Sequence, residues 1–198
     1  MEQKRKRGRP RTVERERTVM LAMENYWREG LHALSINEVC RRANLSKPSL
    51  YREFGGEDGL LDAALNCYAQ EVIAPMAEAV ATHTSFLEGT ESMIEVITSR
   101  MDGPEGCLLV KMRGATERLG PLTKARVDGM VQRMRESYAS MFSRGLERGE
   151  VRSDVTPELA GRYIDMQVTT MLRKLGAGED RNEVAALGRL AFSALVAG

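Results

Sequence analysis

The sequence predicts an all-α protein of about nine helices, in which a short N-terminal module precedes a larger helical region. Apolar residues recur at spacings of three and four over most of the chain. Only 5% of the 198 residues are aromatic, whereas 12 methionines and many leucines and alanines favour helix. Apolar residues make up 42% of the chain, which is enough for a hydrophobic core. No apolar run reaches about 18 residues, so we expect no membrane-spanning helix.

Positive charge is concentrated near the N-terminus, although the net charge is only +1. Residues 1–56 contain 13 lysines and arginines against 7 acidic residues, and residues 57–198 contain 16 against 21. A basic head on an acidic remainder indicates that the head meets a polyanion.

Residues 1–11 contain six basic residues and one acidic residue, so we expect an arm that is disordered when free. Within it, Arg7-Gly8-Arg9-Pro10 resembles the core of an AT-hook, whose arginines lie in a narrow A·T-rich minor groove. We therefore predict DNA contacts for Arg7 and Arg9. A solubilising tail is the alternative.

Two helical patterns are expected before residue 44. The first runs from about residue 12 to 29, and its spacing assigns Met20, Tyr26 and Trp27 to the buried face. The second opens with Ser35 and has Glu38 three residues later, which predicts a capping box in which the two side chains cap each other's amides. Asn44 should end it, because Asn accepts the left-handed conformation.

A third, short helix should begin after Ser46, with Pro48 in its first turn, where a missing amide costs little. Leu50 and Phe54 are four residues apart and should point inward together. A helix of two turns is not stable alone, so it must be carried by a scaffold and present its outer face to a partner. Helix, tight turn and basic second helix are typical of a helix-turn-helix reader of the major groove.

The predicted DNA contacts divide by role. Ser35, Ser46 and Tyr51 are candidates for phosphate contacts. Lys47 and Arg52 have donors suited to guanine, whereas Ser49 and the Pro48 ring suit base edges or a thymine methyl. Solvated side chains are the alternative for each.

These residues resemble the DNA-binding segment of the TetR family of bacterial repressors. The resemblance is carried by Val39-Cys40, Ala43-Asn44-Leu45-Ser46, Ser49-Leu50-Tyr51 and Phe54-Gly55. It covers residues 12–65 closely and extends to Gly106-Cys107-Leu108-Leu109-Val110. Asn44 stands where the family usually has Gly, and Glu57 stands where it often has a Lys near the start of the fourth helix.

The remaining pattern is helical. A helix from Glu57 should end or kink near Pro75, and others should cover 86–101, a short stretch from Cys107, 121–148, 156–175 and 181–196. The last two are apolar over a wide arc, which indicates burial on more than one side. The resemblance implies that they form a four-helix dimer interface. Burial within a single subunit is the alternative.

We therefore divide the chain into a basic arm (1–11), a helix-turn-helix domain (12–56) and a ligand-binding and dimerisation domain (57–198). In the last of these the resemblance implies a cavity for a small-molecule effector. Arg100 and Arg113 are the polar candidates, which would favour an anionic ligand. The other candidate lining residues are Met93, Ile97, Met101, Cys107, Met134, Tyr138, Met166 and Thr170.

Nothing in the sequence indicates catalysis. His32 and His83 have no ligand partners at metal spacing, and no nucleotide or nucleophile motif is present, so we expect no enzyme, metal or cofactor. Three widely spaced cysteines indicate a reducing cytoplasm rather than disulfides, although Cys107 leaves a redox switch open.

The sequence predicts a homodimeric regulator of transcription that binds double-stranded DNA at a palindromic operator, as a repressor relieved by its effector. An architectural protein that binds A·T-rich DNA without a specific operator is the alternative.

Overall fold

The computed structural model describes residues 11–99 and 106–198, and these residues form the predicted all-α fold. Within these ranges the extended structure is limited to an antiparallel bridge between Val151 and Val196. The elements are α1 (Arg11–Glu29), α2 (Ile36–Arg42), α3 (Lys47–Phe54), α4 (Glu57–Tyr68), a π-helical turn (Ala69–Ile73), α5 (Ala74–Ala81), α6 (Phe86–Thr98), α7 (Leu108–Arg113), a 3₁₀ turn (Thr116–Arg118), α8 (Pro121–Glu147), α9 (Pro157–Gly176) and α10 (Arg181–Ser193).

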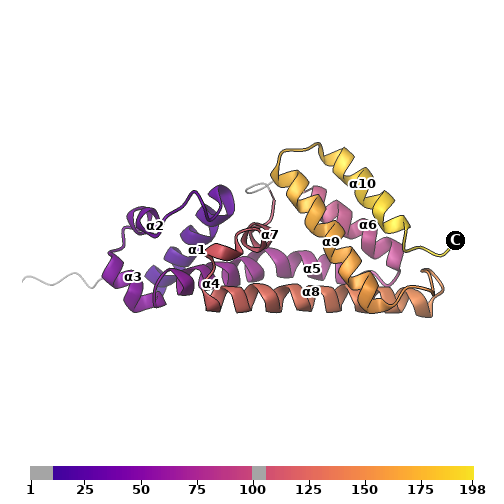
Figure 1. The fold of residues 1–198 in the computed structure, drawn as a ribbon, viewed down its shortest axis with the longest axis horizontal. Coiled ribbons are helices and arrows are strands. Elements are labelled where there is room, and N and C mark those ends of the chain that lie inside the picture. The colour runs from indigo at the N-terminus through magenta and orange to yellow at the C-terminus, as the bar shows by residue number, and fades with distance from the viewer. Residues whose placement is uncertain (1–10, 100–105) are drawn as a thin grey trace, which may run out of the picture.

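Counting α4, the π-turn and α5 as one continuous helix, the described residues contain nine helices longer than a single 3₁₀ turn, as predicted. None of them is long and apolar enough to cross a membrane. Figure 1 shows an elongated molecule with the head (α1–α3) at one end and α9 and α10 toward the other.

The head is built as the sequence predicts. α2 ends in a turn where Asn44 takes a left-handed conformation with φ 51°, and Ser46 caps α3 through the amide of Ser49. α1 buries Tyr26 and Trp27. Met20, expected on the same face, is half exposed, because its position lies beyond the edge of the stripe that α4 covers.

The fourth helix was predicted to end or kink near Pro75; it does not end there, and its regular α-helical pattern is instead interrupted just before Pro75. The chain makes a π-turn over Ala69–Ile73, in which the amide of Ala74 bonds to the carbonyl of Ala69, five residues back. Pro75 then falls in the first turn of α5, where its missing amide leaves little unsatisfied. The helix therefore continues to Ala81 in a shifted register.

Asp58, in the first turn of α4, fixes α4 to the start of α8. Its carboxylate accepts hydrogen bonds from the amides of Leu122 (2.9 Å) and Thr123 (3.0 Å) and from the Thr123 hydroxyl (2.7 Å). Those amides have no partner within α8, so Asp58 caps a helix that lies more than 60 residues away. A Cβ at Gly120 would lie 2.3 Å from the Asp58 carboxyl carbon, so only glycine fits there.

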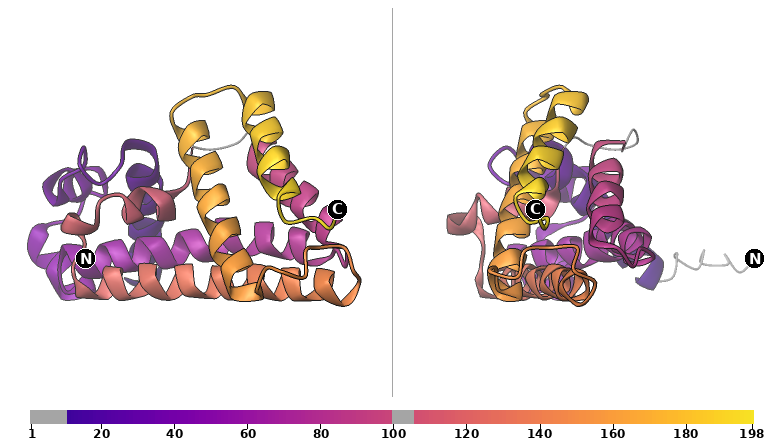
Figure 2. Two further views of the ribbon diagram at one scale, coloured as in Figure 1. Left: turned by 45° about the vertical axis from the view of Figure 1, so that its right-hand side comes forward. Right: turned by 90° about the vertical axis from the view of Figure 1, so that its right-hand side faces the viewer.

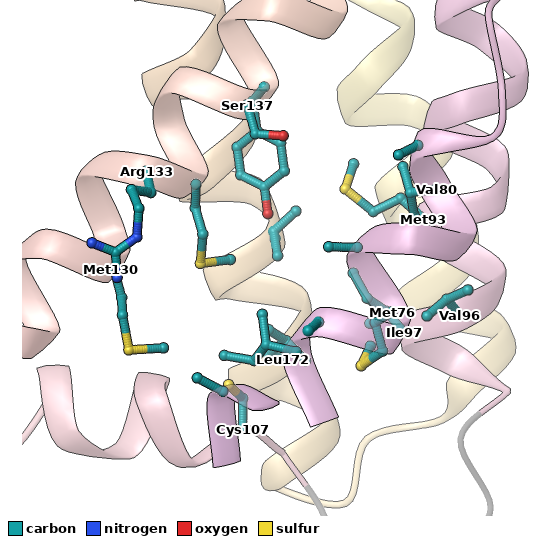
Figure 3. Close-up of a pocket in the computed structure, with 18 of the residues that line it drawn as sticks. Met76, Val80, Met93, Val96, Ile97, Cys107, Met130, Arg133, Ser137 and Leu172 are labelled. Carbon is teal, nitrogen blue, oxygen red and sulfur yellow. The ribbon is translucent and has the colours of Figure 1, made fainter. Parts of the chain in front are cut away.

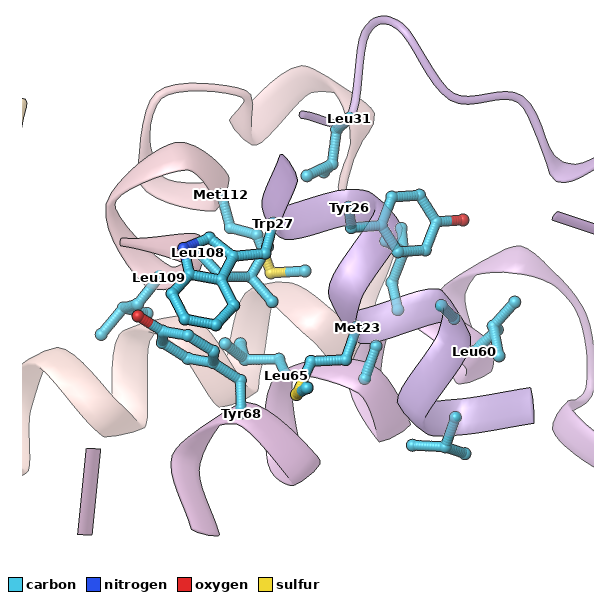
Figure 4. Packing of buried hydrophobic residues seen from close by; sticks show 14 of the residues in the cluster. Met23, Tyr26, Trp27, Leu31, Leu60, Leu65, Tyr68, Leu108, Leu109 and Met112 are labelled. Carbon is cyan, nitrogen blue, oxygen red and sulfur yellow. The ribbon is translucent and has the colours of Figure 1, made fainter. Parts of the chain in front are cut away.

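The buried residues form two hydrophobic clusters. One joins the head to α4, α7 and the first half of α8, and the other joins α6, α9, α10 and the second half of α8. In the first cluster the Trp27 ring meets Tyr68 edge to face, with centroids 5.0 Å apart, and lies beside Leu108 and Leu109 (Figure 4). The division of the chain at residue 56 stays a prediction, because the core of the head continues across it.

Replacing Asp58 with alanine should lower the free energy of unfolding by about 1–2 kcal/mol, the usual cost of losing a helix cap. Burial alone would raise the pKa of this carboxyl, but the hydrogen bonds from Thr123 and Leu122 outweigh it and hold the pKa below its usual range. The stabilisation is therefore present above about pH 4 and is lost as pH falls through the lowered pKa.

Urea denaturation at pH 7 and at pH 3 measures both effects. Asp128→Ala, an exposed position on α8, is the control. If the Asp58 variant loses no more free energy of unfolding than the Asp128 variant, Asp58 does not act as a helix cap.

Candidate nucleic-acid interface and ligand pocket

α3 is held in the head by its inward face. Leu50 and Phe54 are buried against the first cluster, and the Arg15 guanidinium lies 5.1 Å from the centre of the Phe54 ring. Gly55 ends the helix in a left-handed conformation, φ 75°. The short helix is therefore held mainly by α4 and α2, with Arg15 of α1 against Phe54, rather than by its own hydrogen bonds.

The outward face of α3 is open. Lys47 and Pro48 are exposed, Tyr51 is 56% exposed and the Arg52 side chain is 64% exposed. Ser49 accepts hydrogen bonds from the Ser46 hydroxyl (2.9 Å) and from Arg52 Nη2 (3.2 Å). These five residues thus form one polar, basic surface, which we call the α3 face (Lys47, Pro48, Ser49, Tyr51 and Arg52). Whether it contacts DNA stays a prediction.

Ser35 caps α2 as predicted, accepting from the amide of Glu38 at 3.3 Å, but the reciprocal half of the capping box is wrong. The Glu38 carboxylate turns away and binds Arg41 at 2.6 and 2.8 Å and Arg42 at 2.7 Å. Two guanidinium groups are stronger donors than one amide. The hydrogen bond from Arg41, which has the larger effect, and the one from Arg42 lower the pKa of Glu38 to about 2.

Arg42 also binds Glu29 and Asn25 on α1, a brace that the sequence analysis missed. Its hydrogen bond lowers the pKa of Glu29. The brace fixes α2 on α1 and so sets the position of the turn before α3. An arginine at the end of α2 could have indicated such a contact, but the sequence alone does not identify its partners, which lie 13 and 17 residues away.

Glu57, Arg7 and Arg9 flank the head in the sequence. Glu57, which takes the place of the family's frequent Lys, pairs with Arg118 at 3.5 Å. Arg7 and Arg9 lie outside the described residues.

A cavity of about 590 Å³ lies between the π-turn and α5 on one side and α8 on the other (Figure 3). It forms because α4 packs on α8, whereas α5, after the π-turn, packs on α6 instead. Parts of α6 and α9 and the segment Gly106–Cys107 close it. The predicted residues that border it are Met93, Ile97, Cys107, Met134 and Tyr138. Their contact with a ligand stays a prediction.

Tyr138 provides a neutral polar group inside this cavity. Burial, and then the nearby Asp165 carboxylate, raise the pKa of its phenol above the usual range, so the hydroxyl keeps its proton at neutral pH.

Three predicted lining residues lie elsewhere. Arg113 reaches α9 and binds Asp165 (2.9 and 3.1 Å) and Thr169 (2.9 Å), and Arg135 binds the same carboxylate at 2.9 Å. Because Asp165 is buried, this pairing holds Arg113 between the helices and away from the cavity. Met166 and Thr170 project outward from the exposed side of α9. Arg100 and Met101 lie outside the described residues.

The α5 side of the cavity and its basic lining were not predicted from the sequence. The π-turn that displaces α5 has no signal in the apolar spacing. The lining residues that were not predicted come from the π-turn and α5 or are arginines: Ile73, Ala74, Met76, Ala77, Val80, Ala81, Arg133, Arg144 and Arg181.

The cavity wall touches the head directly. Trp27 Nε1 donates to the carbonyl of Gly106 at 3.2 Å, and Lys111 Nζ donates to the carbonyl of Trp27. Gly106 and Cys107 line the cavity, so one short segment contacts both the cavity and α1.

Residues 21–64 match the profile of bacterial regulatory proteins of the tetR family. The HTH-type transcriptional repressor ComR of Escherichia coli (strain K12) is 27% identical over 112 residues, which cover 54% of this chain and 53% of ComR. The match therefore spans about half the length of this curated relative.

The whole fold has solved counterparts. A TetR-family transcriptional regulator from Agrobacterium tumefaciens superposes with a TM-score of 0.80 at 16% identity, covering 94% of this chain and 99% of that one. A cysteine mutant of the regulator CifR, solved with 26-base-pair double-strand operator DNA, gives 0.73 at 20% identity, covering 95% and 100%. Residues 21–64 thus carry the sequence profile of the tetR family, and the chain shares the fold of TetR-family regulators along most of its length. At the turn before α3, Asn44 takes the left-handed position where that family usually has Gly.

Replacing Trp27 with phenylalanine should lower the free energy of unfolding by about 1–3 kcal/mol, because the change removes the bond to Gly106 and leaves a gap beside Tyr68 and Leu108. Urea denaturation followed by circular dichroism measures it. Tyr51→Phe, at an exposed ring, should cost less than about 0.5 kcal/mol. Equal costs would mean that Trp27 does not join the two parts.

Proposed function

We propose that the protein is a sequence-specific DNA-binding regulator of transcription that acts as a homodimer and releases its operator when a small molecule fills the cavity. The observation that supports this best is the α3 face, which belongs to a short basic helix packed on the head by its inward side and whose outward side chains no described residue covers. Such a helix suits the major groove. The cytoplasm suits both the DNA partner and the three free cysteines.

Dimerisation is supported by an uncovered apolar surface on the last two helices. Leu159 and Met166 on α9 and Leu187 and Leu190 on α10 are between 41% and 71% exposed. α9 and α10 lie side by side (Figure 2), so two copies would form a four-helix interface. Two-fold symmetry would then place the two α3 helices about 34–36 Å apart, one turn of DNA, or a multiple of it.

In this proposal residues 12–56 bind DNA, and residues 57–198 bind the ligand and form the dimer. An effector in the cavity would press on α5 and on Gly106–Cys107, the segment bonded to Trp27. It would shift the spacing of the heads only if it binds one spacing more tightly than the other. Ser35, Ser46 and Tyr51 would bind phosphates, and Arg7 and Arg9 the adjacent minor groove.

Replacing Lys47 or Arg52 with alanine should weaken operator binding by about 1–3 kcal/mol if the lost contact is bidentate to guanine, and should relax sequence preference at one position of each half-site. The operator is first located by footprinting the DNA beside the protein's own reading frame, and affinities are then measured by fluorescence anisotropy at fixed salt. Lys124→Ala and Arg148→Ala, exposed on or at the end of α8, are the matched controls.

Unchanged affinity and preference in both α3 variants would remove this face from the reader role. Binding that depends strongly on salt but not on sequence would instead support the architectural alternative, which the exposed α3 face does not favour.

Replacing Leu190 or Met166 with aspartate should convert the dimer to a monomer, because each change buries a charge in an apolar interface. Sedimentation equilibrium measures the association. Met20→Asp, a half-exposed methionine in the head, should leave the dimer intact. A wild-type protein that stays monomeric at micromolar concentrations would refute the dimer.

A further inference from the structure

The charge of the cavity lining differs from that of the region that builds it. Residues 57–198 carry more acidic than basic side chains. The described residues that line the cavity nevertheless include Arg133, Arg144 and Arg181 and no aspartate or glutamate. Arg181 donates to the carbonyl of Thr98 at 2.7 Å, so it is partly used by the fold itself. Arg133 and Arg144 both come from α8.

The two α8 arginines belong to a polar row along the cavity mouth. Arg133, Ser137, Ser140 and Arg144 follow one another at spacings of four, three and four, so they share one side of the helix, and all four are exposed. Arg144 Nη1 donates to the Ser140 hydroxyl at 3.2 Å. We call these four residues the α8 rim.

Neither rim arginine forms an ion pair with a described residue, in contrast to other arginines of the same region. Arg113, Arg126 and Arg189, for example, are each bound to an aspartate or glutamate. On the opposite edge of the mouth, all the residues that α5 contributes to the lining are apolar. The small ones among them are Ala74, Ala77 and Ala81.

Behind the rim the cavity is apolar. Met76, Met93 and Ile97 lie across from Met130 (Figure 3), and Met134 also borders the space. Flexible thioether side chains adapt to an extended apolar chain more readily than branched ones. The mouth is also long, since positions 133 and 144 on one helix are about 16 Å apart.

We propose that the cavity binds an amphipathic monocarboxylate, whose apolar chain lies among the methionines and whose carboxylate pairs with one of the two arginines of the α8 rim, Arg133 or Arg144. This inference rests on the proposed role of the cavity as the effector site and names the chemical class of the effector. A guanidinium binds a carboxylate through two parallel hydrogen bonds, and the rim serines supply additional donors.

Three probes with the same chain and different head groups test the proposal: decanoate, decanol and decyltrimethylammonium, titrated calorimetrically into the full-length protein without DNA. Decanoate should bind about fivefold more tightly than decanol, and the ammonium most weakly. Raising the salt concentration should weaken the binding of decanoate but not that of the other two probes.

Arg133→Gln and Arg144→Gln should each weaken decanoate binding about twofold, and together should remove its advantage over decanol, while decanol binding stays unchanged. Arg148→Gln, a nearby exposed arginine outside the lining, should change neither. Ala77→Trp, which fills the mouth from an exposed position, should abolish binding of all three probes. Circular dichroism verifies that each variant is folded.

Equal affinity for decanoate and decanol, an Arg148 effect as large as the Arg133 effect, or no binding of any probe would overturn the proposal. Operator binding is measured separately. Decanoate that binds with the expected preference but does not release the operator would support the ligand class and refute the effector role. If the calorimetric test fails, the DNA-binding role is still decided independently, by the operator measurements.

Discussion

The carboxylate of Asp58 is the contact on which the arrangement of this chain depends. It belongs to the first turn of α4, which also supports α3, and it satisfies the first free amides of α8, the longest helix. Beside it Arg126 on α8 binds Asp62 (2.9 Å) and Asn66 (2.9 Å) on α4. These contacts make the start of α4 and the start of α8 one unit, so the position of α3 is tied to the helix that forms a wall of the cavity.

A second connection runs through the indole of Trp27. Its ring packs on Tyr68 from α4, its N–H bonds to Gly106, and its own carbonyl accepts from Lys111. Burial lowers the pKa of Lys111 below its usual range. The head is thus held at two separate points, by Asp58 near α8 and by Trp27 near the cavity.

Local signals explain what the sequence could predict. Ser46, Pro48 and Asn44 act on neighbouring residues, so the bounds of α2 and α3 follow from chemistry within a few positions. Features that join distant residues were not predictable in the same way. Glu38 is a local case in which two partners compete: its carboxylate binds Arg41 and Arg42, three and four residues away, and not the predicted Ser35 amide. Asp165 occupies a position of the inward stripe of α9, which in retrospect indicated a buried partner, but only the fold identifies it as Arg113.

The π-turn at Ala69–Ile73 has a consequence for how such a cavity arises. A π-turn contains one residue more than the α-helical turn it replaces, so everything after it is rotated by about 100°. In this chain that rotation presents Ala74, Ala77 and Ala81 to the cavity mouth and leaves α5 without a buried residue. A one-codon deletion in this turn would restore regular helix and turn a different set of side chains toward α8, so the shape of the site can change by insertion or deletion without any substitution in its lining.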